Sequence, residues 1–223
     1  MVARRCPISS TNRGGLRSEA DNYATPAWAI KRLLDVYQPW GRVWMEPAAG
    51  DGVIIRTVNE VAPELKWIAC ELREECRPGL LHTLVDPRRV IITDFIQKPP
   101  AIPLGKQVDV VITNPPYRLA QEFIETSFRY APVVLMLLRL NFLGSDDRAG
   151  FLRKYPPDVF VLPNRPSFKG NGKTDSPEYA WFRFFPRMER THGSVQVLPS
   201  TPAEERGLRG RVRKTPTVSG ENA

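Results

Sequence analysis

The chain has 223 residues, of which 42% are hydrophobic and 25% charged, and its formal net charge is +8. This length suits one substantial core and is short for two full domains, and the composition is ordinary for a soluble globular protein. The excess of Lys and Arg favours a polyanionic partner, because neutralising phosphates releases condensed counterions. A basic tail kept for solubility explains the same charge equally well.

Several other classes of protein are excluded. Three cysteines, an odd number, do not make a disulfide framework. Cys70 and Cys76 lack the close pairing and nearby histidines of a zinc site, so no metal is expected. The N-terminus has no apolar signal-peptide core, and the longest apolar run, residues 133–138, is too short to span a bilayer. These features predict a cytoplasmic protein.

The elements follow one another in a regular order along the chain. Residues 1–20 are polar and show no periodicity, which predicts a flexible basic N-terminal arm. Helices are predicted at residues 26–37, 53–61, 119–130 and 145–155, together with a helix-like stretch after residue 71 that Pro78-Gly79 interrupts. Strands are predicted at residues 43–46, 67–71, 90–93, 108–113, 133–140, 158–162 and 179–185.

This alternation predicts one α/β domain over residues 21–186, built on a mainly parallel sheet with helices on both faces. The near-continuous apolar character of the strands agrees with burial on both sides. Thr25 and Ser145 stand where N-caps are expected, and Pro26 stands in a first helical turn. Residues 187–223 lose their aromatic content and gain Pro, Gly, Ser, Thr and Arg, which predicts a basic, disordered C-terminal tail.

Ligands of such sheets bind beyond the carboxyl ends of the strands, and four groups of residues stand there. The first is the turn 46–52, where Gly50 and Gly52 allow a ligand to approach the backbone and a helix N-terminus follows. The second is Glu71, whose carboxylate can accept hydrogen bonds from ribose hydroxyls. The third is Asp94-Phe95, which could bind an adenine amino group and stack on the purine. Each of these, taken alone, is more often an ordinary turn or a solvated carboxylate.

The fourth group, Asn114-Pro115-Pro116-Tyr117, is the most specific signal in the chain. Each proline fixes its own φ and pushes the preceding residue out of the helical region, so the tetrapeptide is stiff. It holds the Asn side-chain oxygen and the following carbonyl in fixed directions at a strand end. Two such acceptors can free the lone pair of a conjugated amino group for attack on a methyl sulfonium, and Tyr117 can stack on the base. The alternative is a Pro-rich turn with a buried Tyr.

With these four groups in this order, the chain resembles class I S-adenosylmethionine-dependent amino-DNA methyltransferases of the N6-adenine type. The resemblance covers residues 21–186 and implies a Rossmann-like, mostly parallel seven-stranded sheet with one antiparallel strand, which we assign to residues 179–185. It implies that the methyl donor, S-adenosyl-L-methionine, lies against all four groups, the last of which, Asn114-Pro115-Pro116-Tyr117, acts as a clamp on the target amino group. The implied cofactor-binding residues are Glu46, Pro47, Ala48, Gly50, Gly52, Glu71, Asp94, Phe95 and Asn114.

Two further segments carry the resemblance. Tyr23, Thr25 and Pro26 are similar to the N-terminal cofactor motif of the family, which implies that Thr25 lies near the methionine carboxylate. The segment that begins at Arg165 looks like one found in small phage and prophage DNA methyltransferases. We expect it to form the wall of the target-base pocket together with Tyr117, through Arg165, Ser167, Phe168 and Asp175.

The resemblance implies methyl transfer to N6 of adenine in double-stranded DNA, with the adenine flipped out of the duplex. Many relatives carry a long target-recognition domain, whereas the segment after Pro186 is short and predicted to be disordered. Short or weak sequence specificity is therefore expected. RNA adenine and a glutamine side chain of a protein are alternative acceptors, and a non-catalytic nucleic-acid-binding subunit is a further alternative.

Overall fold

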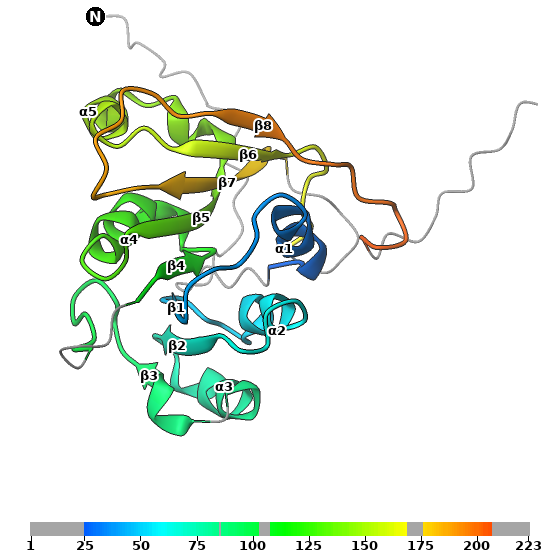
Figure 1. The fold of residues 1–223 in the computed structure, drawn as a ribbon, viewed down its shortest axis with the longest axis vertical. Coiled ribbons are helices and arrows are strands. Elements are labelled where there is room, and N and C mark those ends of the chain that lie inside the picture. Colours follow the sequence, from blue (N-terminus) through cyan, green and yellow to red (C-terminus); the bar gives the residue numbers. More distant parts are fainter. Residues whose placement is uncertain (1–24, 85, 103–107, 169–175, 207–223) are drawn as a thin grey trace, which may run out of the picture.

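The computed structural model describes residues 25–84, 86–102, 108–168 and 176–206 (Figure 1). Over these residues the chain forms one eight-stranded sheet in the order β3-β2-β1-β4-β5-β7-β6-β8. Strand β7 runs antiparallel to β5 and β6, and all other neighbouring strands are parallel. The strands are β1 (Val43–Glu46), β2 (Lys66–Glu71), β3 (Val90–Ile92), β4 (Val110–Thr113), β5 (Val133–Arg139), β6 (Asp158–Leu162), β7 (Tyr179–Phe184) and β8 (Val195–Val197).

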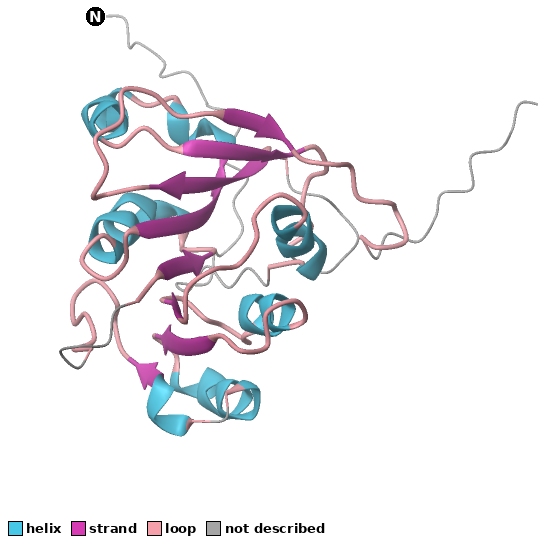
Figure 2. Ribbon diagram, in the orientation of Figure 1, coloured by secondary structure: helices cyan, strands magenta, loops and turns pink. Residues whose placement is uncertain are grey.

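Helices cover both faces of the sheet, as Figures 1 and 2 show. Buried residues of α1 (Ala27–Leu34), α2 (Val53–Asn59) and α3 (Arg77–Thr83) belong to one hydrophobic cluster, and those of α4 (Ala120–Ser127) belong to another. Helix α5 (Asp146–Lys154) packs on the second cluster through half-buried side chains. Four 3-10 turns complete the elements: η1 (Glu74–Cys76), η2 (Pro87–Arg89), η3 (Tyr117–Leu119) and η4 (Leu140–Leu143).

The predicted fold class is confirmed, because each of the seven predicted strands is present and the last of them is antiparallel. The structure adds an eighth strand, β8, within the segment for which disorder was predicted. Its residues are all exposed, so the pattern of burial that marks a strand is missing from the sequence. Pairing with β6 and the burial of Leu198 hold it at the sheet edge. Residues 207–223 lie outside the described part of the chain.

Two helix starts differ from the prediction. Pro26, not Thr25, is the N-cap of α1, because the carbonyl of Pro26 accepts the first turn's hydrogen bond from Ala29 and the Thr25 side chain points elsewhere. The second difference is at Pro78, which was expected to interrupt a helix and instead lies at the start of one. It stands in the first turn of α3, where a missing N–H costs nothing because that group has no helical partner.

At one place in the sheet, the connections that follow two neighbouring strands lead to opposite faces of the sheet. Strands β1 and β4 are parallel neighbours, but the helices that follow them, α2 and α4, pack on opposite faces of the sheet. A crevice at such a point is where ligands bind in open α/β sheets. Within the part of the chain described, no helix is both long and apolar enough to cross a membrane.

Candidate active site

The turn after β1 is shaped by two glycines with left-handed backbone conformations. Gly50 has φ 54° and Gly52 has φ 77°, a region in which a Cβ is strained. The amide of Ala49 donates to the carbonyl of Cys70 at 2.9 Å, and the amide of Gly50 donates to Glu71 Oε2 at 2.7 Å. The turn is therefore fixed against the end of β2, and the first two predicted groups form one surface.

Glu71 is buried and its carboxylate is held by three donors. Oε1 accepts from the backbone amide of Arg73 at 3.1 Å and from its Nε at 2.9 Å, in addition to the Gly50 contact with Oε2. Burial by itself raises the pKa of the Glu71 carboxyl, but the hydrogen bonds from Arg73 and Gly50 outweigh it and hold the pKa below its ordinary value. Glu71 is thus ionised and oriented at the edge of the sheet.

Glu46 ends β1 beneath the same turn, and the pKa of its carboxyl is shifted in the opposite direction to that of Glu71. Its side chain is buried, and among the described residues its Oε2 has no hydrogen-bond partner. Burial, followed by the nearby carboxylates of Asp51 and Glu71, raises the pKa of Glu46 well above its ordinary value. A buried acceptor without a donor is costly, which makes this position suited to a cationic ligand group.

The Asp94-Phe95 pair turns its side chains in different directions. Asp94 Oδ1 accepts from the amides of Ile96 and Gln97, both at 2.9 Å, and so caps the turn after β3. Phe95 is 3% exposed, and its ring stacks on Phe123 at a centroid distance of 5.4 Å. The structure therefore shows a turn-capping carboxylate beside a core ring, and contact of either residue with an adenine stays a prediction.

Asn114 follows β4 directly and lies beside the N-terminal segment of the domain. Its Nδ2 donates to the hydroxyl of Thr25 at 3.1 Å, although the two residues are far apart in the sequence. Thr25 is 7% exposed, so this bond is shielded from water. Because the Thr25 hydroxyl accepts a hydrogen bond from Nδ2, the oxygen and nitrogen of the Asn114 amide are told apart and the side chain is oriented. The Asn-Pro-Pro-Tyr motif and the predicted cofactor segment therefore meet here.

Tyr117 stands at the centre of a group of aromatic side chains. Its ring centroid lies 6.3 Å from that of Phe168 and 5.6 Å from that of Tyr179, and the guanidinium carbon of Arg139 lies 4.8 Å over its ring. Phe168 and Tyr179 are themselves in contact at 5.0 Å. The segment that begins at Arg165 therefore does reach the Asn-Pro-Pro-Tyr motif, as the proposed pocket wall requires.

The rest of that segment frames the same wall. Arg165 forms an ion pair with Glu178, the residue before β7. The hydroxyl of Ser167 is buried and has no hydrogen-bond partner among the described residues. Tyr23 and Asp175, two predicted site residues, lie outside the described residues. Of the other predicted positions, Pro26 is the N-cap of α1, buried Pro47 and half-buried Ala48 follow β1, and Pro115 and Pro116 follow β4.

Three residues near the site were not singled out from the sequence. Leu72 is 63% exposed directly after Glu71, and Arg73 is the partner of that carboxylate. Arg139 closes β5, whose other residues are all buried. The signal for Arg139 was present in the sequence, because a single cation ends an otherwise apolar run at the carboxyl end of a strand.

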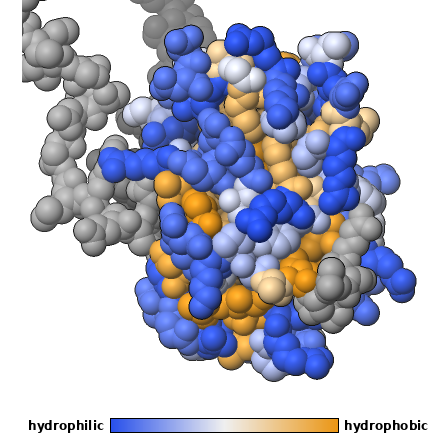
Figure 3. All heavy atoms as spheres, turned by 90° about the vertical axis from the view of Figure 1, so that its left-hand side faces the viewer, coloured by the Kyte–Doolittle hydropathy of each residue, from blue (hydrophilic) through white to orange (hydrophobic). Residues whose placement is uncertain are grey.

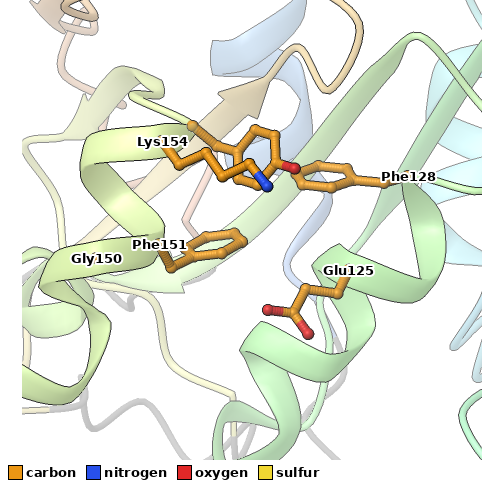
Figure 4. A pocket seen from close by; sticks show the side chains of 6 residues that line it. Glu125, Phe128, Gly150, Phe151 and Lys154 are labelled. Atoms are coloured by element: carbon orange, nitrogen blue, oxygen red, sulfur yellow. The ribbon is translucent and has the colours of Figure 1, made fainter.

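A hollow of about 500 Å³ lies elsewhere on the protein, between the ends of α4 and α5. Three aromatic rings line it, and the side chains of Glu125 and Lys154 stand at its rim (Figure 4). Its ring Phe151 packs on Phe184, which pairs with Val134 near the start of β5. The hollow therefore lies towards the amino ends of the parallel strands, whereas the predicted site lies at their carboxyl ends. Hydrophilic and hydrophobic residues are mixed on the face of the protein that Figure 3 shows.

The sheet order, its antiparallel strand β7 and the loops at the carboxyl ends define a Rossmann-like methyltransferase fold. No protein-family model matches the sequence, and no curated protein matches it. The structure is similar to the type I restriction-modification system methyltransferase subunit from Streptococcus thermophilus, with a TM-score of 0.63 and 12% identity over 85% of this chain and 53% of that chain. This chain therefore spans about half the length of that subunit.

Two other solved structures share the fold. The 23S rRNA methyltransferase ErmE is 14% identical with a TM-score of 0.52, covering 76% of this chain and 70% of that one. A dimethyladenosine transferase from Plasmodium falciparum is 12% identical with a TM-score of 0.51, covering 74% and 63%. At such identities the likeness establishes the fold alone. Among the described residues, no group of three or more His, Cys, Asp or Glu side chains is placed to hold a metal ion.

Proposed function

We propose that the protein is an S-adenosylmethionine-dependent methyltransferase that methylates N6 of adenine in DNA. The observation that carries the proposal is the position of Asn114-Pro115-Pro116-Tyr117. The motif directly follows β4, the strand beside β1, and its Asn side chain is fixed by Thr25. The connections that follow β1 and β4 leave towards opposite faces of the sheet, which is where ligands bind in open α/β sheets, and both the motif and the glycine turn follow these two strands.

The residues around the glycine turn suit the cofactor. The positive φ of Gly50 and Gly52 keeps the backbone open to close approach. Glu46 offers a buried acceptor for an α-ammonium group, and ionised Glu71 can accept from ribose hydroxyls. Exposed Leu72 follows Glu71 and provides an apolar surface for an adenine ring. When bound, the cofactor supplies a methyl group on a sulfonium, which is the electrophile.

The chain's own residues would act on the target amino group by position rather than by proton abstraction. The Asn114 side-chain oxygen and the following backbone carbonyl each accept one N–H of N6, which draws the nitrogen away from conjugation with the ring. With the methyl group supplied from the sulfonium, these two acceptors would hold the amino nitrogen as it gains the methyl group and the positive charge that the sulfonium gives up. The nitrogen then loses one proton to solvent, so no basic side chain is needed.

The aromatic wall favours a planar acceptor. Three rings, those of Tyr117, Phe168 and Tyr179, lie within 6.3 Å of one another. Stacking of a base on an aromatic side chain is worth about 1–3 kcal/mol, whereas an aliphatic glutamine side chain has no flat face to stack. A duplex adenine would have to be flipped out to reach this wall.

Two measurements test the proposal. Cofactor titration by calorimetry should show S-adenosylmethionine binding, which a non-catalytic nucleic-acid-binding subunit lacking the cofactor site would not show. Labelled cofactor should then be offered with unmethylated DNA, with RNA and with protein in separate reactions. We expect label in DNA. Label in RNA alone, or in protein glutamine alone, would replace the proposed substrate while leaving the enzyme class intact.

A further inference from the structure

The chain continues beyond β8 as a segment, residues 198–206, that packs against the domain. The amide of Leu198 donates to the carbonyl of Val161 at 2.9 Å, which extends the contact of β8 with β6 by one residue. Leu198 is 2% exposed and belongs to the same hydrophobic cluster as Phe168. Figure 1 shows this segment in orange, leaving the ends of β6 and β8 and passing beside α1. It is an addition to the seven strands that the resemblance implies.

One hydrogen bond joins this segment to the loop that follows β6. The backbone amide of Thr201 donates to Oδ1 of Asn164 at 2.6 Å, and Thr201 is 2% exposed. Strand β6 runs parallel to β4 and β5, because β7 is antiparallel to both β5 and β6. Asn164, just after β6, therefore lies at the same edge of the sheet as Asn114, and the segment 198–206 holds the loop where it leaves the sheet.

From Asn164 the loop leads directly to the wall of the proposed base pocket. Pro166 lies between Asn164 and Phe168, is buried, and restricts the backbone on both sides of itself. The ring of Phe168 lies 6.3 Å from that of Tyr117 and 5.0 Å from that of Tyr179. Because the intervening chain is short and stiff, the direction that the backbone takes at Asn164 affects the place of the Phe168 ring.

The same segment is also tied to α1. Nη2 of Arg32 lies 3.4 Å from Oε2 of Glu205. Helix α1 begins just after Thr25, whose hydroxyl accepts from Asn114. The segment 198–206 therefore bridges the helix beside the Asn-Pro-Pro-Tyr motif and the loop that carries the aromatic wall. The ion pair is partly exposed and contributes little, so the bond to Asn164 is the contact to test.

We propose that Asn164 is a positioning residue for the target base, because its bond to the Thr201 amide holds the loop 163–168 where Phe168 can meet that base. The inference rests on the proposed function for the identity of the base and for the role of the wall. A contact with the base that is equally strong before and during methyl transfer affects KM rather than kcat. Asn164 should therefore act on the KM for DNA.

The test uses Asn164→Ala, which removes the acceptor of the Thr201 amide. Asn59→Ala is the matched control, because Asn59 Oδ1 also accepts one hydrogen bond, from Nε1 of Trp67 at 2.8 Å, near the amino end of β2 and away from the site. We expect Asn164→Ala to raise the KM for DNA about two- to thirteenfold, the effect of losing one neutral hydrogen bond, with kcat and cofactor affinity little changed. Asn59→Ala should leave KM unchanged.

The control separates positioning from a general loss of stability. Both substitutions remove one partly buried hydrogen bond, so both should lower the melting temperature. Only Asn164→Ala should raise KM. An equal KM in the two variants, or a loss in Asn164→Ala that is confined to kcat, would overturn the proposal.

A second measurement does not depend on catalysis. Amide hydrogen exchange in peptides that cover residues 163–168, followed by mass spectrometry in the cofactor-bound protein, should be faster in Asn164→Ala and unchanged in Asn59→Ala. Unchanged exchange in Asn164→Ala would refute the positioning role even if the protein methylates DNA. Faster exchange in a protein that methylates no nucleic acid would retain the hold on the loop and remove the proposed function instead.

Discussion

The hydrogen bond between Thr25 and Asn114 makes a quantitative prediction about catalysis. Thr25→Val keeps the shape of the side chain and removes the oxygen that accepts from Asn114 Nδ2 at 3.1 Å. Without this partner the amide loses one of the contacts that orient it, and its oxygen is held less firmly for the target N–H. A neutral hydrogen bond of this kind contributes about 0.5–1.5 kcal/mol, so we expect kcat to fall roughly two- to thirteenfold.

The assay is steady-state methyl transfer at saturating cofactor, together with a cofactor titration. Thr25→Ser, which keeps the hydroxyl, is the matched control and should recover most of kcat. The cofactor dissociation constant of both variants separates this effect on kcat from the cofactor contact that the resemblance implies for Thr25. If Thr25→Val instead weakened cofactor binding and left kcat unchanged, Thr25 would act on the cofactor and the orientation argument for Asn114 would be wrong.

Three further substitutions test the electrostatics of the fold and the cofactor cradle. Asp158 is buried, yet hydrogen bonds from Arg190, Arg183 and Ser194 hold its pKa well below the ordinary value, so its stabilising effect is lost as pH falls through that lowered pKa. Asp158→Ala should therefore cost about 3–5 kcal/mol at neutral pH, measured by urea unfolding, and a loss below about 1 kcal/mol would contradict this. Glu46→Gln should gain stability relative to the original chain as pH rises, because burial raises the pKa of Glu46, so the stability that its neutral carboxyl contributes is lost as pH rises from the ordinary pKa through the raised one; a difference that is constant from pH 5 to 8 would refute this. Glu71→Gln should weaken cofactor binding roughly ten- to a hundredfold while the melting temperature of the cofactor-free protein changes little, and unchanged binding would exclude Glu71 from the cofactor site.

The order of elements could be predicted because the strands of this sheet are apolar over nearly their whole length. Strand β5, buried at every position but the last, is an example. Strand β8 could not be predicted, because both of its valines are exposed and its position depends on β6, far away in the sequence. A short edge strand of this kind carries no periodic signal.

The site could be predicted in part for a similar reason. Gly50, Glu71 and Asn114 follow strands, and the parallel arrangement of those strands brings their ends together. The contacts between Asn114 and Thr25 and between Tyr117 and Arg139 depend on side-chain packing across the sheet edge. The ring of Phe95 packs on Phe123 in the core, and its contact with the cofactor stays a prediction.

In the proposed reaction, Asn114 holds an adenine amino group of DNA for methylation. The most direct measurement is nucleoside analysis of unmethylated DNA after incubation with the cofactor and either the original chain or Asn114→Ala, with cofactor affinity measured for both. We predict N6-methyladenine with the original chain, none with Asn114→Ala, and nearly equal cofactor affinities. N6-methyladenine formed by Asn114→Ala at an undiminished rate, or no methylated adenine in DNA with either chain, would contradict the account.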